Sequence, residues 1–229
     1  MYCMEYIAND YTLDLTGGFP LSTDSMVLHD FVKLPKNAKV LDLGSGCGTL
    51  GLLLCARSSS CTVTGVELDP AAHAAALNNI ARNDLASRLF SICADLRTMP
   101  VPPGSFDVCV SNPPYFSGGA RHSKNPVARQ EETCTPKELF AAASNALRWG
   151  GDFFLVHKPE RLAELCCEAS LVGLEPKRLR LIRHRPDAPI SLILLSCRRG
   201  GKPGLQIDEL CLHNADGTPT ANYKRIYNL

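Results

Sequence analysis

Short apolar runs alternate with longer stretches of helical character along most of the chain. The runs typical of buried strands cover residues 39–43, 62–67, 89–94, 106–111, 152–157, 179–183 and 190–197. Helices are expected over residues 23–32, 49–57, 70–82, 135–149 and 159–171. Strands that alternate with helices at this spacing form βαβ units. The pattern therefore predicts a single α/β domain with a doubly wound, mostly parallel sheet of seven strands, the Rossmann-like arrangement.

Composition places the chain among ordinary globular proteins. Of its 229 residues, 45% are apolar and 21% are charged. The longest apolar stretch, residues 50–56, is far shorter than the ~20 residues that span a membrane, and the first residues do not resemble a signal peptide. The 11 cysteines are odd in number and include no C-x-x-C pair, so neither disulfides nor a metal site are expected. We therefore expect a cytoplasmic protein.

The charge is distributed unevenly along the chain. Residues 176–202 hold eight Lys and Arg residues and one acid, Asp187, which gives this segment +7 although the whole chain carries +1. A surface that faces a polyanion such as a nucleic acid would show this asymmetry. Arginines that protect the exposed edge of a sheet would show it too. The charge alone leaves both interpretations open.

A glycine-rich loop follows the first predicted core strand. Asp42 is followed by Gly44, Gly46 and Gly48 in the pattern D-x-G-x-G-x-G. Glycines at the carboxyl end of a strand allow a sharp turn and let a ligand approach the bare backbone. A dinucleotide-binding G-x-G-x-x-G pattern can also be traced through Gly46, Gly48 and Gly51. The loop therefore predicts a cofactor site without choosing the cofactor.

Acidic residues follow the next two strands. Glu67 ends the run 62–67, where a carboxylate can accept hydrogen bonds from both hydroxyls of a ribose, as in NAD enzymes and in methyltransferases. Asp95 follows the run 89–94 and could accept a hydrogen bond from an adenine amino group. With the glycine loop, these two acids predict an adenosine pocket.

The sequence Asn112-Pro113-Pro114-Tyr115 follows the fourth core strand. This N-P-P-Y motif resembles motif IV of the S-adenosylmethionine-dependent methyltransferases that alkylate amino nitrogens of adenine, cytosine, guanine or glutamine, and the loop from Asp42 resembles their motif I. The Asn112 amide oxygen and the Pro113 carbonyl would accept the two N–H groups of the target amine and turn its lone pair toward the methyl group. Tyr115 would stack on a flipped base.

Further segments resemble the tRNA(Val) adenine N6-methyltransferase family, from about Asp10 to the carboxyl terminus. They are residues 19–28, 128–132 and 156–162. The resemblance implies a class I methyltransferase that uses S-adenosylmethionine, with Thr23 and Asp24 beside the methionine end of the cofactor. It also implies that the substrate is the N6 amino group of an adenine in a tRNA anticodon loop. Gln130 departs from the family, which commonly has histidine or lysine there.

The resemblance also suggests how the chain is divided. We expect residues 1–35 to pack at the cofactor site, residues 36–200 to form the catalytic core and residues 201–229 to form a tail. The long segment after Tyr115 is expected to contact substrate through Arg121, because loops of this length in compact domains are usually functional. Arg180 and Arg183, in the basic segment, are expected to extend the RNA-binding surface.

Four other functions remain as alternatives. Protein-glutamine N5-methyltransferases share N-P-P-Y but carry a helical domain ahead of motif I, and about forty residues precede the loop here. An rRNA guanine N2-methyltransferase would share the same chemistry. A non-catalytic module that binds S-adenosylmethionine or RNA would have no need of the amine-binding Asn112. A NAD-dependent oxidoreductase is disfavoured because no proton donor is placed for hydride transfer.

Overall fold

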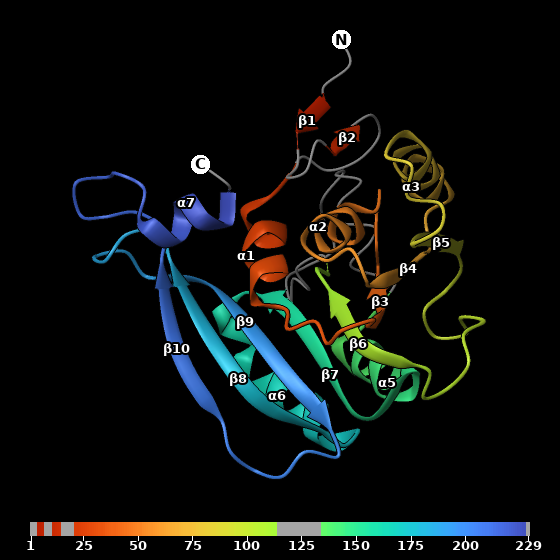
Figure 1. Ribbon diagram of the computed structural model, residues 1–229. Helices are drawn as coiled ribbons and strands as arrows, with labels where there is room; N and C mark the ends of the chain where they lie inside the picture. The colour runs from red at the N-terminus through yellow and green to blue at the C-terminus, as the bar shows by residue number, and fades with distance from the viewer. Residues whose placement is uncertain (1–3, 7–10, 15–20, 114–133, 228–229) are drawn as a thin grey trace, which may run out of the picture.

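The short apolar runs of the sequence form the centre of one eight-stranded sheet (Figure 1). The computed structural model describes residues 4–6, 11–14, 21–113 and 134–227. In spatial order the strands are β10 (Gln206–Cys211), β8 (Leu174–Arg183), β9 (Ile190–Arg199), β7 (Leu147–His157), β6 (Phe106–Ser111), β3 (Lys39–Leu43), β4 (Thr62–Glu67) and β5 (Leu89–Cys93). The short strands β1 (Met4–Tyr6) and β2 (Thr12–Asp14) pair separately.

The carboxyl ends of nearly all strands lie at the same edge of the sheet, because these strands run in the same direction. Only β9 runs antiparallel to its neighbours β7 and β8. The remaining pairs are all parallel, including β10 with β8. The carboxyl ends of β3, β4, β5, β6, β7, β8 and β10 therefore meet at one edge, which is where ligands bind in such sheets.

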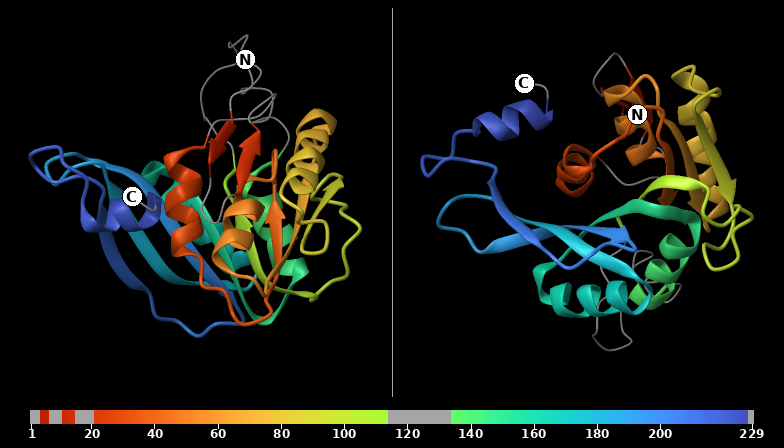
Figure 2. Two further views of the ribbon diagram at one scale, coloured as in Figure 1. Left: turned by 45° about the horizontal axis from the view of Figure 1, so that its top comes forward. Right: turned by 60° about the horizontal axis from the view of Figure 1, so that its bottom comes forward.

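Helices cover both faces of the sheet, as Figure 2 shows. One face packs against α1 (Thr23–Phe31), α2 (Thr49–Arg57), α3 (Pro70–Arg82) and α7 (Ala221–Tyr227). The other packs against α5 (Pro136–Ala146) and α6 (Leu162–Leu171), and the turn η1 (Pro159–Arg161) leads into α6. Because successive strand residues point to opposite faces, Val40 lies in the first core and Leu41 in the second. This explains why the central strands are continuous apolar runs.

The doubly wound α/β fold is confirmed, but the sheet has eight strands instead of seven. The additional strand, β10, lies within the expected tail and pairs in parallel with β8. It is an edge strand whose first residues are exposed, with Ile207 62% exposed and only Leu210 buried. It therefore lacks the alternation by which a half-buried strand is recognised.

One boundary between a helix and a strand also differs from the prediction. Helix α5 ends at Ala146, and β7 begins directly at Leu147 instead of residue 152. The register shift between the β6 residues Phe106 and Val108 accommodates these extra β7 residues. No helix among the described residues is long and apolar enough to cross a membrane.

Candidate active site

The glycine loop is held against the end of the neighbouring strand. The backbone N–H groups of Gly44 and Ser45 both donate to the carbonyl of Val66, at 2.9 and 3.1 Å. Gly44 and Gly46 have φ angles of +73° and +55°, a left-handed conformation that disfavours other residues. A Cβ atom built on either glycine would have no atom within 4 Å. The loop therefore has an open side, where a ligand can lie against the backbone.

Glu67 fixes the shape of this loop. One oxygen of its buried carboxylate accepts the N–H of Gly46 at 2.7 Å, and the other accepts the N–H of Asp69 at 2.8 Å. Each carboxylate oxygen has a second lone pair. Glu67 can therefore hold the loop and still accept hydrogen bonds from a ribose, the role predicted from the sequence.

Asp42 is a buried acid beneath the loop. It is 1% exposed, and neither of its carboxyl oxygens has a hydrogen-bond partner among the described residues. Burial, with a smaller contribution from the charge of Glu67, raises the pKa of Asp42 to about 8. The buried hydroxyl of Ser45 is likewise without a described partner. Buried polar groups of this kind are normally paired, so these atoms suit the polar part of a bound molecule.

Replacing Asp42 by asparagine should change how stability depends on pH. Because the pKa of Asp42 is raised in the folded protein, folding becomes progressively less favourable as the pH rises from about 4 to 8. Asparagine does not titrate. The melting temperature of Asp42→Asn relative to the wild type, without added ligand, should therefore increase by roughly 10 °C between pH 5 and pH 8. A difference that stays constant or shrinks over this range would show that Asp42 is ionised throughout.

Asn112 lies directly after β6, next to the glycine loop. The buried hydroxyl of Ser111 donates to the carbonyl of Leu43 at 2.8 Å and thereby joins the ends of β6 and β3. The Nδ2 atom of Asn112 donates to the Oγ of Ser25 at 3.0 Å. This bond fixes the rotation of the amide and directs its oxygen away from Ser25. Pro113 is buried at the next position.

The hydrogen bond between Asn112 and Ser25 shows that the first turn of α1 lies over this end of β6. The helix begins after Ser22, whose side chain accepts the N–H of Ser25. Burial raises the pKa of Asp24, and the charge of Lys158 opposes that shift. Thr23 and Asp24, in the same turn, therefore lie near Asn112, and their role at the cofactor stays a prediction. Ser25 was missed as a site residue, although it lies in the same segment, because nothing in the sequence connects it with a residue so far along the chain.

Asp95 lies at the same edge, but its carboxylate is already bonded. Arg97 donates to both Asp95 oxygens through its side chain, with Nε at 2.9 Å from each, and through its backbone N–H at 2.9 Å. These hydrogen bonds lower the pKa of Asp95. The Arg97 side chain also donates to Glu138 at 3.4 Å, at the start of α5. An adenine amino group would therefore share Asp95 with Arg97.

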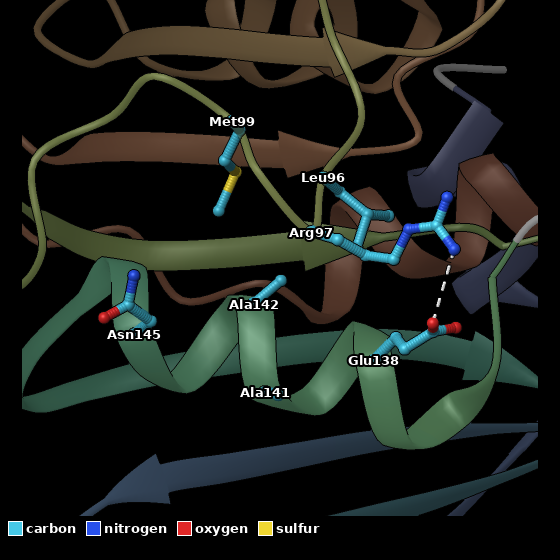
Figure 3. Close-up of a pocket in the computed structure, with 7 residues that line it drawn as sticks. All are labelled: Leu96, Arg97, Met99, Glu138, Ala141, Ala142 and Asn145. Carbon is cyan, nitrogen blue, oxygen red and sulfur yellow. Dashed lines mark hydrogen bonds and ion pairs between the residues drawn. The ribbon is translucent and has the colours of Figure 1, made fainter.

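A cavity of about 480 Å³ adjoins this ion pair (Figure 3). It lies between the loop after β5 and helix α5, and its lining residues are Leu96, Arg97, Met99, Glu138, Ala141, Ala142 and Asn145. None of the residues assigned to the cofactor or to catalysis lines it. The cavity is therefore separate from the candidate site at the glycine loop and Asn112.

Comparison with known families identifies the class of protein. The sequence model of a family described as "Methyltransferase small domain" matches residues 22–171, which include the glycine loop, Glu67, Asp95 and Asn112. The chain belongs to this methyltransferase family. The methyltransferase class predicted from the two motifs is therefore confirmed.

Several curated relatives of this methyltransferase carry one name, tRNA1(Val) (adenine(37)-N6)-methyltransferase. The protein from Bacteroides fragilis is 32% identical over 180 residues, which are 77% of this chain and 76% of the relative. The protein from Photobacterium profundum is 28% identical, covering 86% and 85% of the two chains. The protein from Aeromonas hydrophila is 30% identical, covering 89% and 86%. These relatives confirm the family resemblance seen in the sequence.

Solved structures agree with the fold. A protein of Agrobacterium tumefaciens described as a predicted O-methyltransferase superposes with a TM-score of 0.75 at 21% identity, covering 90% of this chain and 96% of that one. A geranyl diphosphate methyltransferase in complex with SAM superposes at 0.58 with 14% identity, covering 76% and 84%. At these identities the likeness shows the Rossmann-like fold alone.

The arginines predicted to bind substrate are paired within the methyltransferase. Arg180 donates to both carboxylate oxygens of Asp208 on β10, at 2.6 and 2.8 Å, and lies 3.6 Å from Asp30 on α1. Arg183 donates to Glu209 at 2.7 Å. These acids lie outside the basic segment of the sequence and offset part of its charge. A role in substrate binding for Arg180 and Arg183 stays a prediction.

Reversing the charge of Arg180 should therefore destabilise the fold. Arg180→Glu would place a third carboxylate beside Asp208 and Asp30, the latter only 11% exposed in its side chain, and should lower the free energy of unfolding by about 2 kcal/mol. Lys202→Glu, in the same segment but with an exposed side chain, should change it by less than about 0.5 kcal/mol. Equal effects of the two variants in urea unfolding would show that the Arg180 pairs contribute nothing to stability.

Three residues of the predicted site lie outside the described residues: Pro114, Tyr115 and Arg121. Their assigned roles in catalysis and substrate binding stay predictions. Within the described residues, no group of three or more His, Cys, Asp or Glu side chains is placed to hold a metal ion.

Proposed function

We propose that this protein transfers a methyl group from S-adenosylmethionine to the N6 amino group of an unpaired adenine in a tRNA anticodon loop. The observation that carries the proposal is the position of Asn112. Its amide is fixed by Ser25 at the carboxyl edge of the sheet, directly beside the open glycine loop. The shared name of the relatives supports the choice of tRNA and of adenine.

The residues at this edge fit the proposed cofactor. The open backbone at Gly44 and Gly46 gives room for the ligand, Glu67 offers lone pairs for the ribose, and the buried atoms of Asp42 and Ser45 offer polar partners. When bound, S-adenosylmethionine supplies an electrophilic methyl group on a sulfonium. A neutral Asp42 avoids placing a second negative charge beside Glu67 before the ligand enters.

Asn112 would prepare the amine for attack. The lone pair of an exocyclic adenine amine is delocalised into the ring, which makes the nitrogen a weak nucleophile. By accepting one N–H in its amide oxygen, with the Pro113 carbonyl accepting the other, Asn112 would favour a more tetrahedral nitrogen with its lone pair aimed at the methyl group. The methylated product is acidic and loses its proton to water. No side-chain base is needed before transfer.

An unpaired loop base suits a domain of this size. Bases in single-stranded loops can be extruded at low cost, so the amine can reach Asn112 without the opening of a duplex. The position after the anticodon, adenine 37, is the one that the names of the relatives specify.

The proposal is tested by comparing tRNA from cells with and without the gene. Nucleoside mass spectrometry of purified tRNA(Val) should show N6-methyladenosine only when the gene is present. Restoring the gene with Asn112→Ala should leave the nucleoside absent. Unchanged tRNA together with loss of methylation on release factor or on rRNA guanine would contradict the substrate and leave the chemistry intact.

A further inference from the structure

Two histidines lie at the same edge of the sheet as Asn112. His184 directly follows β8, and His213 follows β10. Both strands run parallel to β6, because β8 and β7 are each antiparallel to β9 and β7 is parallel to β6. Their carboxyl ends therefore lie on the active-site side of the molecule, beside α1 and α7 (Figure 1).

These histidines join two tyrosines of α7 in a continuous row of rings, which we call the aromatic cluster (His184, His213, Tyr223 and Tyr227). The ring centroids of His184 and His213 are 4.5 Å apart, those of His213 and Tyr223 are 4.8 Å apart, and those of Tyr223 and Tyr227 are 4.2 Å apart. The tyrosine rings are stacked, with an interplanar angle of 16°. Aromatic pairs at such distances stabilise one another.

At one end of the aromatic cluster, Tyr227 contacts α1, the helix that carries Ser25. The Tyr227 hydroxyl donates to the Oγ1 of Thr23 at 3.3 Å, and Thr23 is the first residue of α1, close to the Ser25 that holds Asn112. Arg225 donates to Asp30 on the same helix. The tyrosines therefore have a packing role, which is to fasten α7 to α1.

At the other end of the aromatic cluster, His184 follows β8 and does not belong to the contact between α7 and α1. The ring of His184 contacts that of His213 but the residue is exposed, so the ring stays accessible to a ligand. Exposed cations adjoin two members of the cluster in the chain, since Arg185 follows His184 and Lys224 follows Tyr223. Lys224 on α7 has no ion pair among the described residues, and the side chain of Arg185 is 51% exposed with its nearest acid, Asp187, at 3.8 Å.

We propose that the aromatic cluster binds unpaired nucleotides that neighbour the target base, with one base stacked on the exposed ring of His184. Exposed aromatic rings combined with nearby cations are the chemistry by which proteins hold single-stranded nucleic acid, since every base has a face to stack and every phosphate a charge to neutralise. Three inter-strand spacings separate β8 from β6, or about 14 Å. A few extended nucleotides can span this distance. The inference rests on the proposed function, because it names how that RNA is held.

The inference predicts a specific effect of removing the ring of His184. His184→Ala should raise the KM for an anticodon stem-loop RNA about tenfold, as for the loss of one base–aromatic stack. The kcat, the affinity for S-adenosylmethionine and the melting temperature should stay within error. His184→Phe should retain the low KM, whereas His184→Leu, which has bulk but no aromatic ring, should not.

Trp149 provides the matched control. It is 74% exposed and lies near the amino end of β7, at the opposite edge of the sheet. Trp149→Ala should leave the KM for the stem-loop unchanged. An equal rise in KM for both variants would overturn the inference, because the effect would not then depend on the aromatic cluster.

A stem-loop with 2-aminopurine next to the target adenine reports stacking directly. Its fluorescence should be quenched on binding to the wild type and to His184→Phe, and quenched much less by His184→Ala. If His184→Ala quenches and methylates this RNA as the wild type does, the inference is wrong and the proposed function stands. If the wild type methylates release factor or rRNA and no tRNA, both are wrong.

Discussion

Asn112→Ala should lower the rate of methyl transfer at least a hundredfold and change the affinity for S-adenosylmethionine by no more than a few-fold. The lost group is a preorganised acceptor for the amine, whose removal typically costs two to three orders of magnitude in rate, or about 3–4 kcal/mol. The cofactor contacts assigned to the glycine loop and Glu67 do not involve this side chain. Single-turnover kinetics with tRNA, together with calorimetric titration of the cofactor, separate the two effects.

Ser25→Ala is the informative comparison. It removes the hydroxyl that accepts the Nδ2 atom of Asn112 at 3.0 Å but leaves the amide oxygen in place. The rate should therefore fall less than in Asn112→Ala, by roughly tenfold, which corresponds to the loss of one hydrogen bond that orients the acceptor.

If Asn112→Ala keeps more than a tenth of the wild-type rate, Asn112 does not hold the amine.

Glu67→Ala should weaken S-adenosylmethionine and its demethylated product alike, each by about ten- to a hundredfold. Two losses add in this variant: the acceptor for the ribose, and the bond of 2.7 Å that holds the N–H of Gly46. A hydrogen bond to a charged group is worth about 1.5–3 kcal/mol. Equal effects are expected because the ribose is common to both ligands, and calorimetric titration measures them.

Glu175→Ala serves as the control, because Glu175 lies at the start of β8, at the opposite edge of the sheet. Its affinity for both ligands should equal that of the wild type. Unchanged binding in Glu67→Ala, or tight binding of NAD by the wild type, would show that the assigned pocket is wrong.

The central strands could be predicted from the sequence because their burial dictates which residue types they contain. The strands β3, β4 and β6 lie between two helical layers, so most of their residues are buried and apolar residues occur on both faces. The motifs at their ends then had to meet, because parallel strands share a carboxyl edge. The bond from Ser111 to Leu43 shows how closely the two ends approach.

The sequence did not predict features that depend on a partner far along the chain, or a strand that lies at the exposed edge of the sheet. Strand β10 was missed because an exposed edge strand such as 206–211 has little to bury. The pairing of Arg180 with Asp208 was hidden because the acid lies on that same missed strand. The role of Ser25 depends on Asn112, and the raised pKa of Asp42 depends on complete burial, which the pattern alone does not reveal.

The central claim, that this chain methylates the amino group of one unpaired adenine of tRNA, is tested most directly with purified components. The protein is incubated with labelled S-adenosylmethionine and an unmodified tRNA(Val) anticodon stem-loop, and the product is digested to nucleosides. The label should appear as N6-methyladenosine, and replacement of adenine 37 by guanine should abolish it. Label in another nucleoside, label that survives this replacement, or label only in release factor or rRNA offered in parallel would contradict the claim.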